Sequence, residues 1–82
     1  KKIKDALNDY ILFNTSEPSF NTQEFIALNP DSYDAYFVLG RYFYKKQNFI
    51  KAKEMFNLSL KRELPSILIE KEINNYITLC SE

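Results

Sequence analysis

Residues 33–65, YDAYFVLGRYFYKKQNFIKAKEMFNLSLKRELP, decide the fold of this chain. Helix-forming residues extend from about Tyr33 to Lys46 and resume from Phe49 to about Arg62, and Asn48 between them is a good helix N-cap. Since only two or three residues join these segments, we expect an antiparallel helix hairpin. Such a hairpin cannot bury its own apolar faces, so neighbouring parts of the chain must pack against it.

Helical patterns flank the hairpin on both sides. Upstream, an apolar stripe at helical spacing predicts a helix from about Lys2 to Phe13, and Asn21 with Glu24 three residues later predicts the capped start of a short helix. Downstream, a stripe from Ile67 to Cys80 predicts the last helix. One Gly and three Pro leave few breakers, so we predict an all-α fold of about five helices.

Turn-forming residues separate these helices. Pro30 ends the short helix, and either Asp31 or Ser32 is suited to cap the central helix that follows. Residues 64–66, Leu-Pro-Ser, end the second helix of the hairpin, and either the Pro or the Ser is suited to open the last helix.

The balance of charge argues against several classes of partner. Lys plus Arg and Asp plus Glu both total 11, so no net field attracts nucleic acid or an anionic membrane surface. No apolar run approaches the roughly 20 residues that cross a bilayer, and the basic start, Lys1–Asp5, lacks the long apolar segment of a signal peptide. The single Cys80 cannot form an internal disulfide, which favours a reducing compartment, and we expect a cytoplasmic protein.

The residue types that catalysis needs are scarce. The chain contains no His, which excludes a His-based triad, a His metal ligand and a His general base. Asp31 and Asp34 are better explained as helix caps than as a catalytic pair, and Cys80 is better explained as an apolar filler than as a nucleophile. We therefore expect no enzyme, no catalytic residue, no metal and no cofactor.

The hairpin resembles a tetratricopeptide repeat. The family's first helix carries an aromatic residue, Leu-Gly three and four residues later, and a second aromatic residue; its second helix carries Ala, an aromatic residue four positions later, and a small residue. The matching residues are Tyr36, Leu39, Gly40, Phe43, Ala52, Phe56 and Ser59. Because Gly40 lacks a β-carbon, we expect the helices to approach closely where Ala52 faces it. The alternative is an unrelated amphipathic hairpin with coincidental spacing.

The resemblance implies one domain over residues 1–82, with helix hairpins stacked in a right-handed array. Residues 1–30 have the length of a repeat but lack the Ala and aromatic pattern, so they are interpreted as a degenerate repeat. Residues 31–65 form the well-matched repeat, although its closing Pro65 comes one residue later than in the family. Residues 66–82 keep a stripe without Leu-Gly and are interpreted as the helix that closes the array.

The resemblance also implies a binding site. In the family, the first helix of each repeat lines a concave groove that binds extended or helical peptides. The residues at the matching places are Asp34, Phe37, Val38, Arg41, Tyr44 and Lys45. We expect apolar contact from Phe37, Val38 and Tyr44, and we expect Arg41 and Lys45 to hold a carboxylate or phosphate. In the alternative, Phe37 and Val38 pack on the first helix while Arg41 and Lys45 are solvated.

Two further expectations concern the same helix. Phe37 and Arg41 occupy the places of the Lys and Asn with which some family members hold the carboxylate terminus of heat-shock chaperones, so that ligand is not supported. The residues expected to face solvent are Tyr42, Lys46, Lys51 and Lys53.

The resemblance implies a protein-interaction module, an adaptor or scaffold that binds a protein or peptide. We expect it to bind no nucleic acid and to have no membrane span. The alternative is a structural segment that stacks on a neighbouring domain, or on itself through the ends of the array, and binds no free ligand.

Overall fold

The computed structural model describes residues 2–82, and within them the chain forms five helices and no strand. The helices are α1 (Ile3–Phe13), α2 (Thr22–Leu28), α3 (Tyr33–Lys45), α4 (Phe49–Leu60) and α5 (Ile67–Cys80). The prediction of an all-α fold with about five helices is therefore confirmed. Of the predicted ends of the four long helices, that of the second hairpin helix differs most, at Leu60 instead of Arg62. Lys1, the first residue of the expected domain, lies outside the described residues.

Side-chain caps fix where most of these helices begin. In each case a side-chain oxygen accepts a hydrogen bond from the backbone N–H three residues later, which satisfies one of the amides that a helix start leaves unpaired. The capping residues are Asn21 for α2, Ser32 for α3, Asn48 for α4 and Ser66 for α5. Ser32, and not Asp31, is the cap of the central helix.

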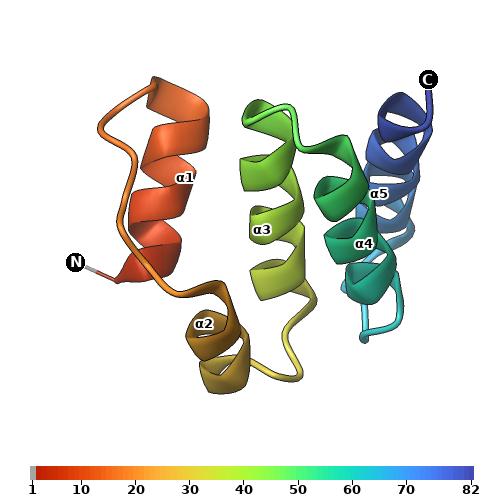
Figure 1. Ribbon diagram of the computed structural model, residues 1–82. Helices are drawn as coiled ribbons and strands as arrows, with labels where there is room; N and C mark the ends of the chain where they lie inside the picture. Colours follow the sequence, from red (N-terminus) through yellow and green to blue (C-terminus); the bar gives the residue numbers. More distant parts are fainter. Residues whose placement is uncertain (1) are drawn as a thin grey trace.

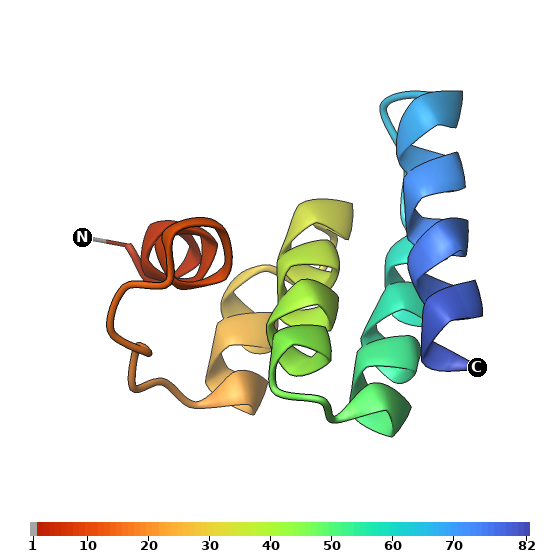
Figure 2. The same cartoon turned by 90° about the horizontal axis from the view of Figure 1, so that it is seen from above.

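The central helix α3 lies between its neighbours. In Figure 1, α1 lies to one side of α3 while α4 and then α5 follow on the other. Figure 2 shows α1, α3 and α5 in one layer and α2 and α4 in the other. The antiparallel α3–α4 hairpin turns at residues 46–48, as its short connection predicts.

Two groups of buried side chains hold α3 in this position. The first joins α1, α2 and α3, together with Met55 of α4, and its fully buried members include Leu7, Val38 and Leu39. The second joins α3, α4 and α5 around Phe56 and Ile73, both fully buried. Because α3 contributes to both groups, each of its faces packs against a different part of the chain.

The close approach of α3 and α4 occurs at Gly40. A β-carbon added there would lie 2.5, 2.6 and 2.8 Å from three atoms of the Phe56 ring, so the ring occupies the space that a larger residue would need. The expected close packing at Gly40 is present, and the three atoms nearest to the added β-carbon all belong to the Phe56 ring. Ala52 is fully buried in the same group of side chains as Phe56.

The segment of residues 14–21 crosses α3 at Tyr42. The Tyr42 hydroxyl donates a hydrogen bond to Glu17 at 2.7 Å, and its ring packs edge-on against Phe20 and at a tilt against Tyr10. Burial, together with the Glu17 carboxylate, raises the pKa of Tyr42 to about 12. The expectation that Tyr42 faces solvent is therefore wrong, because this segment covers it. Lys46 is exposed as expected but binds the same carboxylate.

Candidate binding surface

The surface where α1, α3 and α5 meet carries the predicted binding residues of α3. We call it the central face and define it by Asp34, Arg41 and Tyr44 of α3, with Lys4 and Asn8 of α1 and Tyr76 of α5. α3 forms its floor, since α1 and α5 lie on either side of that helix (Figure 2). Helical spacing places Asp34, Arg41 and Tyr44 on one stripe because they are separated by whole turns, seven and three residues apart.

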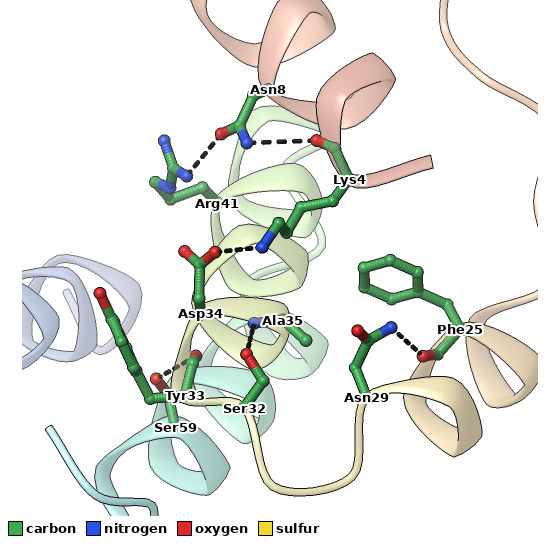
Figure 3. A network of polar contacts seen from close by, with 10 residues as sticks. All are labelled: Lys4, Asn8, Phe25, Asn29, Ser32, Tyr33, Asp34, Ala35, Arg41 and Ser59. Carbon is green, nitrogen blue, oxygen red and sulfur yellow. Dashed lines mark hydrogen bonds and ion pairs between the residues drawn. The ribbon is translucent and has the colours of Figure 1, made fainter. Parts of the chain in front are cut away.

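On the α1 side of the central face, two polar contacts connect α3 to α1 (Figure 3). Lys4 Nζ forms an ion pair with Asp34 Oδ2 at 2.7 Å, and this carboxylate raises the pKa of the Lys4 ammonium through a hydrogen bond and its charge. One turn further along α1, Asn8 Oδ1 accepts a hydrogen bond from Arg41 Nη2 at 2.8 Å. Asn8 is held in turn, since its amide nitrogen donates to the Lys4 carbonyl at 3.1 Å.

Lys45 also binds α1, beyond the central face. Its Nζ donates to the Tyr10 carbonyl at 2.8 Å and to Asn14 Oδ1 at 3.0 Å, and it lies 4.6 Å from the centre of the Tyr10 ring. A cation at the carboxyl end of α1 also stabilises that helix through its dipole. Lys45 is therefore occupied in docking α1, and the alternative in which Arg41 and Lys45 are both solvated does not describe these contacts.

On the α5 side, aromatic rings connect α3 to α5. Tyr44 and Phe37 each pack edge-on against Tyr76, with ring centres 5.5 and 6.0 Å apart. Burial raises the pKa of Tyr76, and the positive charge of nearby Arg41 acts in the opposite direction. The Arg41 guanidinium lies 4.7 Å from the centre of the Phe37 ring. Arg41 thus sits between α1 and α5.

Two of the predicted binding residues belong to the core. Val38 is fully buried in the group that joins α1 to α3, so it has no surface to offer a ligand. Phe37 is 7% exposed and packs on Phe56 and Tyr76, not on the first helix. The expectation that Val38 contacts a ligand is therefore corrected, and Phe37 acts mainly as the support beneath Arg41. The sequence did not show that Val38 and Phe37 are buried, because it does not show that other helices cover α3 on both sides.

The charge on this part of the molecule is unevenly paired. Within residues 2–82, Lys4 is paired with Asp34, whereas Arg41 and Lys45 donate only to uncharged acceptors. Arg41 Nε is also buried without a hydrogen-bond partner among these residues. Leaving a buried donor unpaired costs roughly 1–3 kcal/mol. Arg41 is therefore a half-buried cation whose charge no neighbouring carboxylate neutralises.

Sequence reasoning missed the exposed leucines beside the central face. Leu12 is 61% exposed and follows Asn8 by one helical turn on α1. On α5, Leu68 is 72% exposed and Leu79 is 47% exposed. Helical spacing places both leucines on the same side of α5 as Glu72 and Tyr76. In the sequence, an exposed leucine such as Leu12 cannot be told from a buried one such as Leu7. The two are distinguished only when the packing of the helices is known.

Other features of the described surface lie away from α3. An apolar hollow of about 450 Å³ opens between the start of α1 and the end of α2, beside Ile3, Phe25 and Leu28. Within residues 2–82, no group of three or more Cys, Asp or Glu side chains is placed to hold a metal ion. No helix in this part of the chain is long and apolar enough to span a bilayer.

Comparisons with protein-family models, with curated proteins and with solved structures found no match for this chain.

Proposed function

We propose that this chain is a protein-interaction module of the tetratricopeptide kind, an adaptor or scaffold that binds a segment of a partner protein on the central face. The observation that carries the proposal is Arg41, a half-buried cation with no carboxylate partner among residues 2–82, between exposed leucines on the two neighbouring helices. Arginine and tyrosine are enriched among the residues that dominate protein interfaces, and the central face carries Arg41 together with Tyr44 and Tyr76.

The repeat-like residues of the hairpin support the same proposal from the sequence. Gly40 and Phe56 interlock as two closely packed helices require, and Ser59 donates a hydrogen bond to the Tyr33 carbonyl at 2.8 Å, which ties the end of α4 to the start of α3. A rigid hairpin presents its outer residues in a fixed geometry, which lowers the entropy lost on binding. Binding in place of catalysis, and a cytoplasmic location, are part of the proposal.

The test changes exposed residues, so that binding can be altered while the fold is kept. Leu12→Asp and Leu68→Asp place a charge on either side of Arg41, and Ile50→Asp, at a residue 86% exposed near the start of α4, is the matched control. Partners are recovered from a lysate of the source organism with immobilised wild type and with each variant. We expect the two leucine variants to lose partners that the control retains, since a charge in an apolar contact is left desolvated and unpaired.

If the chain is instead a structural segment that binds no free ligand, the leucine variants should recover the same proteins as the wild type. The hollow at the α1–α2 end is an apolar surface at one end of the array, which favours stacking on another copy or domain. If all three variants recover the same proteins as the wild type, the central face is not the binding site. A concentration-dependent sedimentation coefficient that Leu28→Asp abolishes then supports stacking instead.

A further inference from the structure

We propose that the central face recognises an internal acidic residue flanked by large aliphatic residues, within a segment of the partner protein, and that Arg41 holds its carboxylate. This inference rests on the proposed function and specifies the chemistry of the ligand.

Arg41 is positioned in advance for such a contact. Its Nη2 is fixed by Asn8 at 2.8 Å, and its guanidinium lies against the Phe37 ring at 4.7 Å. A side chain held from two directions loses little rotational freedom when a ligand binds. The planar guanidinium also matches the geometry of a carboxylate, which it can bind through two parallel hydrogen bonds.

The local charges favour a carboxylate. Lys4 and Asp34 neutralise each other, while Arg41 lacks an acidic partner among residues 2–82 and Lys45 adds a second positive charge one turn along α3. A phosphate group brings up to about two negative charges, whereas Arg41 is the one positive charge of the central face without an acidic partner among residues 2–82, and the Glu72 carboxylate that acts on Tyr76 adds to the repulsion. A single Asp or Glu side chain therefore complements this face best.

The exposed leucines determine what surrounds the acidic residue. Leu12 lies on the α1 side of Arg41, and Leu68 and Leu79 lie on the α5 side. A segment that crosses from α1 to α5 with its carboxylate on Arg41 can contact Leu12 on one side and either Leu68 or Leu79 on the other, since the last two lie about 16 Å apart along α5. Large aliphatic residues on both sides of the acid would cover them and exclude water from the ion pair, which strengthens it. The acid is therefore internal to the segment and is not its carboxyl terminus.

Arg62 provides a matched control within the same chain. Its Nη2 donates to the Tyr36 hydroxyl at 3.2 Å, and its guanidinium lies 5.0 Å from the Tyr36 ring centre. Its Nε is also buried, with no hydrogen-bond partner among residues 2–82. It follows α4 in the chain and does not belong to the central face. Arg62→Gln thus removes a similar stacked arginine from a different place.

The experiment selects ligands without assuming their sequence. A random peptide library is displayed on phage with the carboxyl terminus of each peptide fused to the coat protein, so that only side-chain carboxylates are available. It is selected on the wild type, on Arg41→Gln and on Arg62→Gln, each first shown to be folded by circular dichroism and thermal melting. Peptides enriched on the wild type are then synthesised with amidated ends, in pairs that differ by Asp→Asn or Glu→Gln, and their Kd values are measured by fluorescence anisotropy.

We expect peptides with an internal acid between aliphatic residues, and an Asp→Asn change that weakens binding to the wild type by about tenfold or more. The preference for the acid should vanish on Arg41→Gln and persist on Arg62→Gln. If the wild type binds the Asp and Asn peptides equally while Leu12→Asp and Leu68→Asp abolish binding, the inference is wrong and the proposed function stands. If no peptide is enriched on the wild type above the bare support, both fail.

Discussion

Gly40 and Phe56 are the residues on which the α3–α4 contact depends most directly. Phe56 is fully buried, so its ring has no solvent-filled space into which it can move when a β-carbon is added at position 40. Alanine is the better helix former by about 1 kcal/mol, but overpacking of a core costs typically 1–3 kcal/mol. We therefore expect Gly40→Ala to lower the free energy of unfolding, measured by urea denaturation, and Gly40→Leu to lower it further.

A double-mutant cycle separates this packing effect from helix propensity. Phe56→Leu removes the Cε1 and Cζ atoms that the added β-carbon would meet, so Gly40→Ala should cost less in that background than in the wild type. Equal costs in the two backgrounds, or a Gly40→Ala protein as stable as the wild type, would show that the ring does not restrict position 40.

At the scale of elements, the 14–21 segment is fastened to α3 by Glu17. Its carboxylate accepts hydrogen bonds from Lys46 and from the Tyr42 hydroxyl, and these contacts lower the pKa of Glu17 below its ordinary value of 4.5. A depressed carboxyl pKa stabilises the fold above the ordinary value, and that contribution is lost as the pH falls through the folded-state pKa. Glu17→Gln should therefore destabilise the protein at neutral pH and lose its effect in acid.

The measurement is urea denaturation of the wild type and Glu17→Gln across the acidic range. The difference between their free energies of unfolding should be constant above the ordinary glutamate pKa and shrink below it. Glu63→Gln, at another exposed glutamate for which no ion pair is found among residues 2–82, is the control and should show a smaller difference. A Glu17→Gln difference that persists unchanged into acid would mean that the carboxylate does not fasten the segment.

The elements themselves were the predictable part of this molecule. Asn21, Ser32, Asn48 and Ser66 act on backbone amides three residues away, so the sequence places the helix starts to within a residue, although it left Asp31 or Ser32 and Pro65 or Ser66 as alternatives. The contacts across the fold were not predictable in the same way. Tyr42 meets Glu17, and Arg41 meets Asn8, only because α1 and the 14–21 segment pack against α3, and nothing local to either residue specifies its partner.

The local sequence pattern also did not show which residues of α3 are buried and which are accessible. Val38 and Arg41 are neighbours on the helix, three residues apart, yet one is fully buried and the other half-buried. The difference comes from the direction in which α1 docks, which the upstream residues do not encode in any short motif. The candidate site was therefore predicted as a helix face, and its separation into a core part and an accessible part required the packing.

At the scale of the whole molecule, α5 completes the second half of the core. Ile73 is fully buried against the group that contains Phe56, and the Tyr76 ring stacks on Phe56 with centres 4.8 Å apart and planes 15° apart. Ending the chain after residue 66 would expose Phe37 and Phe56 together, and an apolar patch of that kind drives association. We expect this truncated chain to aggregate or lose its cooperative thermal transition, as judged by sedimentation and circular dichroism.

Shortening the chain only after Thr78 is the control for this truncation, because it removes Leu79 and Cys80 while keeping Ile73 and Tyr76. That shorter deletion should leave a folded monomer. A monomeric, cooperative protein ending at residue 66 would instead show that α3 and α4 form a sufficient core without the last helix.

The contact between Gly40 and Phe56 also limits how mutations can accumulate in the gene. Every single-base change of a glycine codon that alters the residue without stopping translation encodes a residue with a β-carbon, and each such atom falls where the Phe56 ring lies. A phenylalanine codon, in contrast, becomes a leucine codon in one step, which removes two of the three ring atoms in the way. A lineage that changes position 56 first passes through a protein with a cavity in its core, whereas the reverse order passes through an overpacked one.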